Sequence, residues 1–445
     1  NIPSQIGNLS QLQHLDLSYN NFEGSIPSQL GNLSNLQKLY LGRYNHDGGA
    51  LKIDNGDDWL SNLISLTHLS LYSISNLNTS HSCLQMIVKL PKLRELSLFD
   101  CSLSDHLIFS SRPSEFNFST CLSILDLSWN AFTSSMILQW LSNVTSNLVD
   151  LDLSHNNLSE DLPPILHILA SGCVRHSLQD LDLTSNQITG SLPDLSVFSS
   201  LKTLDLSYNQ LSGNIPEDLG LPFHLESLSI RSNSLEGGIP KSFGNSCALS
   251  SLDMSYNNLN KELPVIVHQL SGCARFSLQE LNLEGNQING TLPDLSIFSS
   301  LKHLYLDGNK LNGEIPKDIK FPPQLEQLHM QSNSLKGVLT DYNFANMSKL
   351  MLLELSDNSL LALAFSQNWV PPFQLSRIGL RSCKLGPVFP KWLETQNQFE
   401  DIDISNAGIA DMVPKWFWAK LAFRERISMN ISYNNLHGII PNFSL

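Results

Sequence analysis

The sequence has few basic residues and no long apolar runs. Its 445 residues include 27 lysines and arginines against 41 aspartates and glutamates, which gives a formal net charge of −14. A chain with this excess of negative charge repels phosphate backbones, so we expect no nucleic-acid partner. No run of about 18 or more apolar residues occurs, so no segment of this chain is expected to span a bilayer.

The motifs of catalysis, metal binding and cofactor binding are also missing. The chain has no nucleophile elbow, no H-E-x-x-H, no C-x-x-C pair, no P-loop and no G-x-G-x-x-G. The acidic stretch 54–58 lacks the ligand alternation and the closing glutamate of an EF-hand, so we interpret it as a polar surface loop. We therefore expect no enzymatic activity, no catalytic residues, no metal and no cofactor.

What the sequence does contain is a repeat. The string LxxLxLxxN recurs from end to end, for example at 12–20, 122–130, 178–186, 249–257 and 350–358. We count about 17 copies at a spacing of roughly 23–27 residues, a period typical of solenoids. The count includes weak copies in which Cys101, Cys383 or Ala407 takes the place of the asparagine.

The repeat predicts the shape of each coil. Apolar residues alternate around one exposed position, as in a short strand, and stacked copies bury a continuous core beneath a parallel sheet. The asparagine can satisfy backbone groups where the chain turns away. A second string, NxLxGxIP, follows and suits a lateral edge segment, because its glycine permits a tight turn and its proline removes a donor. The sequence therefore predicts an α/β solenoid over residues 1–445, a curved and twisted superhelix with a parallel concave sheet and lateral short strands or 3-10 turns.

These strings resemble the plant-specific leucine-rich repeat, LxxLxLSxNxLxGxIPxxLGxLxxL, along nearly the whole chain. Such arrays are typical of the extracellular domains of plant receptor-like kinases and receptor-like proteins. The stretches 46–71 and 270–296 resemble more closely the receptor-like proteins that recognise fungal ethylene-inducing xylanase and related microbial glycoside hydrolases. The resemblance implies a plant-defence glycoprotein at the extracellular face of the plasma membrane.

The organisation of the chain has three further features. Both ends fall inside a repeat, without polar capping repeats, so we expect a truncated gene product or an excerpt of an ectodomain whose membrane anchor lies outside this chain. Residues 45–60 form an inserted loop. Residues 155–254 and 256–354 form an approximate duplication of a four-coil block, and we interpret it as simple lengthening of the solenoid.

The duplication helps to predict how the seven cysteines pair. Cys247 and Cys273 lie one coil apart and are predicted to form a disulfide. Cys173 is the counterpart of Cys273, but Ser146 is the counterpart of Cys247, so Cys173 is expected to remain a thiol. Sequence alone does not settle the connectivity.

The remaining cysteines are expected to play two roles. Cys101 and Cys383 replace asparagines of the repeat, so we expect buried structural thiols at both places. Cys83 and Cys121 remain as a weaker candidate pair. Ten N-x-[ST] sequons are candidate glycan acceptors in a secreted protein, although some arise by chance in a chain this rich in Asn and Ser: Asn8, Asn32, Asn78, Asn117, Asn143, Asn157, Asn289, Asn346, Asn430 and Asn442.

Candidate binding residues lie where the exposed strand positions depart from the repeat consensus. Exposed aromatic residues and arginine commonly anchor protein interfaces. The alternatives are a tolerated surface variant for each residue alone, and burial over the coil for the tryptophan of the inserted loop. The early group is Lys38, Tyr40, Arg43, Trp59, Tyr72, Phe99 and Trp129, and the later group is Glu284, His303, Tyr305, His329, Gln331, Arg377 and Arg381.

A column of aspartates follows the consensus instead. We expect these residues to form a solvated concave face rather than a catalytic pair. They are Asp16, Asp126, Asp152, Asp182, Asp205, Asp253 and Asp403.

The function that the resemblance implies is ligand recognition. The expected ligand is a secreted microbial protein, a glycoside hydrolase, and the expected partners in signalling are receptor kinases with related repeats. The chain would contact the membrane only through segments that it does not contain. The alternatives are a developmental peptide or carbohydrate receptor, a secreted inhibitor of wall-degrading enzymes, and a non-functional gene fragment.

Overall fold

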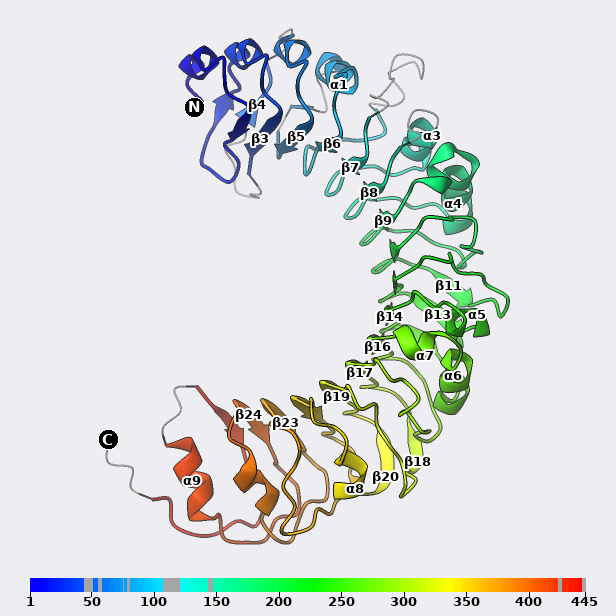
Figure 1. Cartoon of the computed structure of the whole chain (residues 1–445), viewed down its shortest axis with the longest axis vertical. Helices are drawn as coiled ribbons and strands as arrows, with labels where there is room; N and C mark the ends of the chain where they lie inside the picture. The colour runs from blue at the N-terminus through cyan, green and yellow to red at the C-terminus, as the bar shows by residue number, and fades with distance from the viewer. Residues whose placement is uncertain are drawn as a thin grey trace. The chain divides into compact units, whose positions relative to one another are not determined.

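A computed structural model describes residues 1–43, 51–54, 58–74, 76–77, 81–106, 121–142, 147–422 and 426–441. The chain divides into two compact units, which are Asn1–Ser212 with Gly220–Leu225, and Gly213–Leu219 with Glu226–Leu445. Within each unit, short strands stack along one side and the helices lie on the other (Figure 1). The single-solenoid organisation of residues 1–445 stays a prediction.

The first unit contains a ladder of parallel strands, one from each coil. Neighbouring coils pair in register, so that Leu125 lies beside Leu96 and Leu151. The strands are β1 (His14–Asp16), β3 (Lys38–Gly42), β5 (His68–Tyr72), β6 (Glu95–Ser97), β7 (Ile124–Asp126), β8 (Asp150–Asp152), β9 (Asp180–Asp182) and β10 (Thr203–Asp205).

The second unit repeats this arrangement. Its strands also pair in parallel, with Leu281 beside Leu252 and Leu304. They are β12 (Ser227–Ser229), β14 (Ser251–Asp253), β16 (Glu280–Asn282), β17 (His303–Tyr305), β19 (Gln327–His329), β21 (Leu352–Glu354), β23 (Arg377–Gly379), β24 (Asp401–Asp403) and β25 (Ser428–Asn430). The two ladders together hold the 17 parallel strands that the repeat count predicts.

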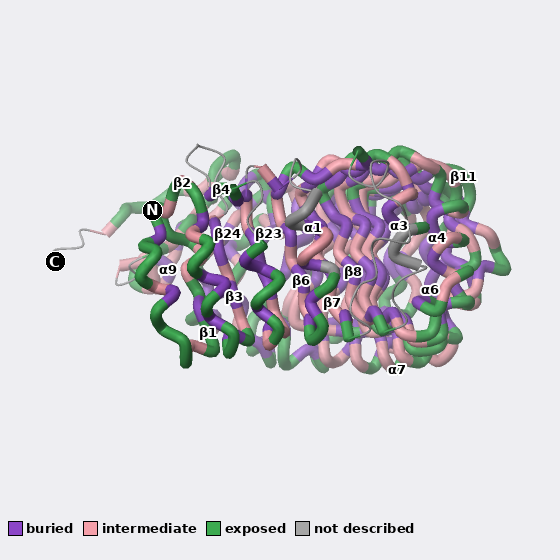
Figure 2. The backbone as a smooth tube through the Cα atoms, turned by 90° about the horizontal axis from the view of Figure 1, so that it is seen from above, coloured by how far each residue is buried: buried purple, intermediate pink, exposed green. Residues whose placement is uncertain are grey.

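The core of each coil comes from the apolar positions of the repeat. Leu249, Leu252 and Met254 of one coil are completely buried. The same positions are buried in coil after coil, as Figure 2 shows along the chain. Burial of this kind stabilises a protein by about 1.5–3 kcal/mol for each large apolar side chain. The predicted α/β leucine-rich-repeat solenoid fold is confirmed.

The asparagine of the repeat links each coil to the one before it. Asn186 donates from Nδ2 to the carbonyl oxygen of Leu153 at 3.0 Å and accepts at Oδ1 from the amide of Leu158 at 3.0 Å. Cys101 and Cys383 are buried in the equivalent places. The Cys383 thiol donates to the carbonyl of Leu355, and burial raises its pKa to about 12. Both residues therefore act as structural thiols.

The residue just before this asparagine turns the chain out of the strand. It has a positive φ in nearly every described coil, for example 58° at Trp129 and 55° at Tyr208. The lateral glycine also has a positive φ, 85° at Gly213 and 93° at Gly313, as its predicted role in a turn requires. The lateral strands are β2 (Gly24–Ser25), β4 (Leu51–Lys52), β11 (Ser212–Asn214), β13 (Ser234–Gly237), β15 (Asn258–Leu259), β18 (Asn312–Glu314), β20 (Ser334–Leu339) and β22 (Leu360–Leu363).

Short helices complete the coils on the side away from the ladder (Figure 1). No helix in the ranges given above is both long enough and apolar enough to cross a membrane. The helices are η1 (Ser4–Asn8), η2 (Ser28–Asn32), η3 (Trp59–Asn62), α1 (His81–Val88), α3 (Met136–Ser142), α4 (Leu162–Ser171), η6 (Cys173–His176), α5 (Lys241–Gly244), α6 (Leu263–Leu270), α7 (Ala274–Ser277), α8 (Asp341–Phe344), η7 (Lys391–Thr395) and α9 (Lys415–Leu421).

One disulfide joins two of these helical segments in the second unit. Cys247 follows α5 and bonds to Cys273, which precedes α7, with their Cα atoms 4.8 Å apart. Cys173 is an exposed thiol. The side chain of Cys83 lies outside the described part of the chain, so its pairing with Cys121 stays a prediction.

Candidate functional site

In each unit the face of the ladder presents the side chains that flank the middle leucine. We call these surfaces, together with the side chains between each strand and the repeat asparagine that follows it, the ladder faces. Because every coil adds a strand in register, residues that are one repeat apart in the sequence lie side by side, about 4.8 Å apart. A ladder face therefore collects residues from many coils into rows.

Three residues of the early group form such a row in the first unit. Tyr72 and Phe99 have ring centroids 6.1 Å apart, and Phe99 and Trp129 are 6.2 Å apart. The row continues to His155, stacked on Trp129 at 4.2 Å, and to Tyr19, which lies 5.7 Å from Tyr72. We call these five residues the aromatic row. Tyr19 and His155 were not predicted from the sequence, although they precede the repeat asparagine just as Trp129 does.

Other members of the early group lie on or beside β3. Lys38 and Tyr40 flank the middle leucine of this strand, and the Tyr40 ring is 5.6 Å from the ring of His14. Burial, with a smaller effect of the Glu95 charge, raises the pKa of Tyr40. Arg43 follows the strand and donates to the side chain of Asn21.

Trp59 lies apart from the early group. It begins η3, which packs beside η2, and only 3% of its surface is exposed. The alternative interpretation of this tryptophan, burial over the coil, therefore agrees with its position in the structure. The binding role of the inserted loop stays a prediction, since residues 45–50 and 55–57 lie outside the described part of the chain.

Next to the aromatic row lies a group of carboxylates, which we call the acidic patch. It consists of Asp126 on β7, Asp150 and Asp152 on β8, and Asp180 and Asp182 on β9. The register places Asp150 beside Asp180, and Asp152 between Asp126 and Asp182. These side chains are partly buried rather than fully solvated, because the neighbouring coils crowd them.

The partial burial changes the proton affinity of the acidic patch. Desolvation is the main cause that raises the pKa of Asp150 to about 6, and the charge of Asp180 adds to it. Desolvation also raises the pKa of Asp152 to about 6, although hydrogen bonds from Ser154 oppose the rise. A positively charged partner would reduce the repulsion between these neighbouring carboxylates.

Three residues of the later group lie together in the second unit. Tyr305 on β17 pairs in register with His329 on β19, and their rings are 4.7 Å apart. The Tyr305 hydroxyl donates to Oε1 of Gln327 at 2.8 Å. His329 Nδ1 lies 3.5 Å from a carboxylate oxygen of Asp307. His303 lies on β17 with Tyr305, and the centroids of their rings are 6.5 Å apart.

Glu284 and Gln331 bracket this cluster. The Tyr256 hydroxyl donates to Glu284, and this bond raises the pKa of the tyrosine to about 12. The backbone amide of Gln331 donates to Asp307 at 2.8 Å. The cluster is thus a continuous polar and aromatic surface.

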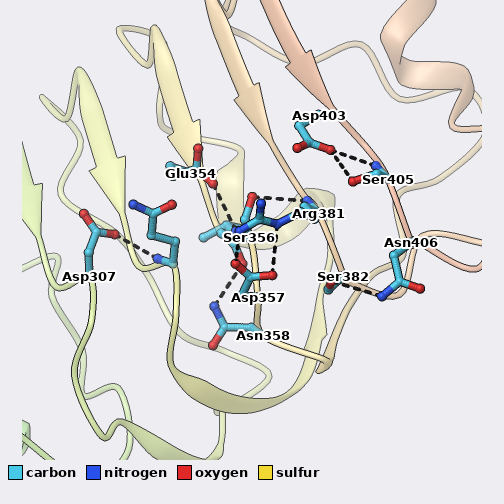
Figure 3. A network of polar contacts seen from close by, with 12 residues as sticks. Asp307, Glu354, Ser356, Asp357, Asn358, Arg381, Ser382, Asp403, Ser405 and Asn406 are labelled. Atoms are coloured by element: carbon cyan, nitrogen blue, oxygen red, sulfur yellow. Dashed lines mark hydrogen bonds and ion pairs between the residues drawn. The ribbon is translucent and has the colours of Figure 1, made fainter. Parts of the chain in front are cut away.

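The two arginines of the later group are held by carboxylates. Arg381 makes two hydrogen bonds to Asp357 (Figure 3). The Nε atom of Arg377 lies 3.6 Å from Glu354 and 3.4 Å from Asp401.

Glu354, a buried carboxylate, was not anticipated from the sequence. It lies in register with Gly379, and a Cβ atom at that glycine would be only 2.0 Å from Glu354 Oε2. The sequence signal for this buried carboxylate was Gly379, which stands where other strands carry a larger side chain and so leaves room for Glu354 beneath Arg377.

Six predicted glycan acceptors lie within the described residues. Asn8, Asn32, Asn157, Asn346 and Asn430 are exposed, and Asn289 is partly buried. Asn430 ends β25 on the ladder face, so a glycan there would cover that end of the surface. Asn78, Asn117, Asn143 and Asn442 lie outside the described ranges.

Metal binding finds no support in the part of the chain that the structure describes. No group of three or more His, Cys, Asp or Glu side chains there could hold an ion.

Comparison with known proteins identifies the repeat independently. The sequence pattern of the Leucine Rich Repeat family matches residues 11–33, 147–169, 200–221, 224–246, 277–296 and 300–321. A solved structure with the same fold is the ectodomain of the Arabidopsis receptor kinase HAESA in complex with an extended IDA peptide hormone ligand. It is 27% identical, with a TM-score of 0.67, over 99% of this chain and 69% of that one.

Two curated relatives are plant receptor-like proteins. Receptor-like protein EIX1 of Solanum lycopersicum is 37% identical over 492 residues, which cover 99% of this chain and 43% of the relative. Receptor-like protein EIX2 of the same plant is 48% identical over 108 residues, 24% of this chain and 10% of the relative. This chain thus spans less than half the length of EIX1. By its repeats, its fold and this identity, the chain belongs to the plant leucine-rich-repeat receptor-like proteins, in the EIX subfamily.

Proposed function

We propose that this chain is the extracellular ligand-binding part of a plant receptor-like protein that senses a secreted microbial glycoside hydrolase in innate immunity. The observation that carries the proposal is the gathering of aromatic and charged side chains on the ladder faces, where the rest of the repeat carries Ser and Asp. Aromatic residues and arginine are the common anchors of protein interfaces. The ligand class rests on the resemblance to the xylanase receptors.

The proposed receptor acts at the plasma membrane through segments outside this chain. It carries glycans on exposed sequons and signals through partner receptor kinases with related repeats, as the resemblance implies. A rigid solenoid face suits this task, since its preformed surface loses little conformational entropy on binding.

A developmental peptide hormone is the second candidate ligand. The structural likeness to the HAESA ectodomain, which was solved with a peptide hormone ligand, favours it.

Biolayer interferometry tests the proposal. The glycosylated chain is presented with a panel of fungal xylanases and xyloglucanases, and with hormone-like and flagellin-type peptides. We expect saturable binding to one hydrolase. Binding to a peptide alone would replace the first candidate with the second, and no binding by folded protein would refute both.

A combined variant locates the site. Tyr40→Ala, Arg43→Ala, Tyr305→Ala and His329→Ala together should weaken hydrolase binding at least tenfold. Phe223→Ala is the matched control, because Phe223 is 77% exposed but lies outside the strands of the ladder. Unchanged affinity of the combined variant would remove these four residues from the site.

A further inference from the structure

Aromatic rings and carboxylates share the same coils of the first unit. Trp129 follows β7, which carries Asp126, and His155 follows β8, which carries Asp150 and Asp152. The two surfaces adjoin at the strand ends: the amide of Ser128, next to Trp129, donates to Asp126 at 2.9 Å, and the amide of Ser154, next to His155, donates to Asp152 at 2.8 Å. The aromatic row and the acidic patch therefore form one continuous surface.

The charge of this surface is predominantly negative. The residues that flank the middle leucines of β7 to β10 include six aspartates and no lysine or arginine: Ile124, Asp126, Asp150, Asp152, Asp180, Asp182, Thr203 and Asp205. A partner of opposite charge would complement it.

We propose that the aromatic row and the acidic patch together bind an extended segment of the protein ligand that carries arginine or lysine. Guanidinium groups stack on aromatic faces and also form strong, often paired hydrogen bonds with carboxylates. This surface offers both kinds of contact within the same coils. The proposal rests on the proposed receptor function and names the chemistry of the segment that this face would recognise.

The four rings of the row that lie on consecutive coils, Tyr72 to His155, set the length of the segment, since Tyr19 lies two coils before Tyr72. From Tyr72 to His155 the row crosses three coil-to-coil steps of about 4.8 Å, roughly 14 Å in all. An extended chain of about four residues covers that distance at about 3.3 Å for each residue. The segment is therefore short.

A neutral sugar is the competing occupant, since sugars also pack on aromatic rings. It would leave the partly buried carboxylates without a countercharge, which favours the cationic segment. A sugar therefore enters the experiment as an opposing outcome.

Fluorescence anisotropy with the full chain tests this inference. The probe is a labelled eight-residue peptide of alternating arginine and serine at 0.15 M salt, roughly physiological ionic strength. Its control has citrulline in place of arginine, which keeps the shape and removes the charge. We expect at least tenfold tighter binding of the arginine peptide. Equal binding of the two peptides, or displacement of the probe by xylohexaose, would overturn the inference.

Variants place the peptide on this surface. Trp129→Ala, and Asp126→Asn with Asp180→Asn, should each weaken arginine-peptide binding at least fivefold, while Trp129→Phe should restore most of it. The matched controls are Phe223→Ala and Glu23→Gln, which alter an exposed ring and an exposed carboxylate of the same unit away from the surface. If neither Trp129→Ala nor the pair Asp126→Asn and Asp180→Asn changes the affinity for the arginine peptide, the proposal is contradicted.

The outcomes separate this inference from the receptor proposal. If a hydrolase binds and Trp129→Ala does not weaken it, the cationic segment is wrong and the receptor function stands. If the arginine peptide binds as expected and no hydrolase in the panel does, the surface chemistry stands and the ligand class is wrong.

Discussion

The two copies of the predicted duplication, residues 155–254 and 256–354, have matching elements but different surfaces. In the first copy, α4 is followed by η6 and the strands β9 and β10. In the second, α6 is followed by α7 and the strands β16 and β17, displaced by about one hundred residues. The buried phenylalanines Phe198 and Phe298 also correspond.

The ladder faces of the two copies differ. Asp182 and Asp205 of the first copy correspond to Asn282 and Tyr305 of the second, and Thr203 corresponds to His303. The first copy continues the acidic patch, whereas the second carries the tyrosine and histidine cluster. The comparison teaches that the buried positions maintain the coil while the residues of the exposed face are free to vary.

The largest expected difference between the copies concerns the cysteines. Cys273→Ser should lower the free energy of unfolding of the second unit by about 3 kcal/mol, because the disulfide closes a loop between residues 26 apart in the sequence. Cys173→Ser should change it by less than about 0.5 kcal/mol. Chemical denaturation measures both, and non-reducing peptide mapping checks the pairing. A bridge between Cys173 and Cys273 would contradict this scheme.

The repeat asparagines should show equal effects in both copies. Asn186 and Asn286 each donate to three carbonyl groups, at 3.0, 3.1 and 3.3 Å and at 3.0, 3.1 and 3.2 Å respectively, and each accepts from one amide at 3.0 Å. Replacing either by alanine should cost about 2 kcal/mol, since buried backbone groups lose their partners. Hydrogen exchange of the neighbouring amides measures the loss. Costs that differ by more than about 1 kcal/mol would show that the copies are not equivalent.

A smaller difference is expected at the turn before the asparagine. Ser185 of the first copy corresponds to Gly285 of the second, and both have a positive φ. Gly285→Ala should cost about 1–1.5 kcal/mol, because its Cβ would lie 2.7 Å from the Tyr256 ring and the backbone is left-handed. Ser185→Ala should cost less than about 0.5 kcal/mol. Thermal unfolding of the two variants compares them, and equal costs would refute the role of the tyrosine ring.

The smallest effect depends on pH. Asp152 precedes the first copy and its folded pKa of about 6 lies above the unfolded value of about 3.9. The folded state therefore binds more protons between pH 4 and 6, so this residue makes the protein less stable as the pH rises through that range.

Asp152→Asn should accordingly stabilise the protein by roughly 1 kcal/mol at pH 7.5, after allowance for solvent screening, and by much less at pH 4. Asp253→Asn is the matched control, since its coil carries Ser251 in place of Asp150. Melting temperatures at the two pH values measure the difference. A gain that is equal at both would disprove the electrostatic cause.

Much of the scaffold could be predicted from the sequence because the repeat is a local rule. The three apolar positions, the asparagine and the lateral glycine each have a fixed place in the string, and each does in the structure what its chemistry suggests. The pairing of Cys247 with Cys273 also follows from spacing, since one coil in sequence is one step in space.

The candidate site was less predictable. The sequence singled out Tyr72, Phe99 and Trp129 but not Tyr19 or His155, because a tyrosine or histidine before the asparagine looks like an ordinary consensus variant. It counted Trp59 among the candidate binding residues with burial over the coil as the alternative, and the packing of η3 beside η2 buries the residue. It also described the aspartate column as solvated, whereas stacking of the coils withdraws part of it from water.

The sequence by itself determined the number of coils, the buried face of each strand and the asparagine links, because these depend on residues within one repeat or its neighbour. Only the tertiary structure decided which side chains meet on the ladder faces and how far they are desolvated. The rings of Phe99 and Trp129 are 30 positions apart along the chain and in contact in space. The proton affinity of Asp152 likewise depends on carboxylates from the coils on either side, since burial and repulsion arise only when the coils stack.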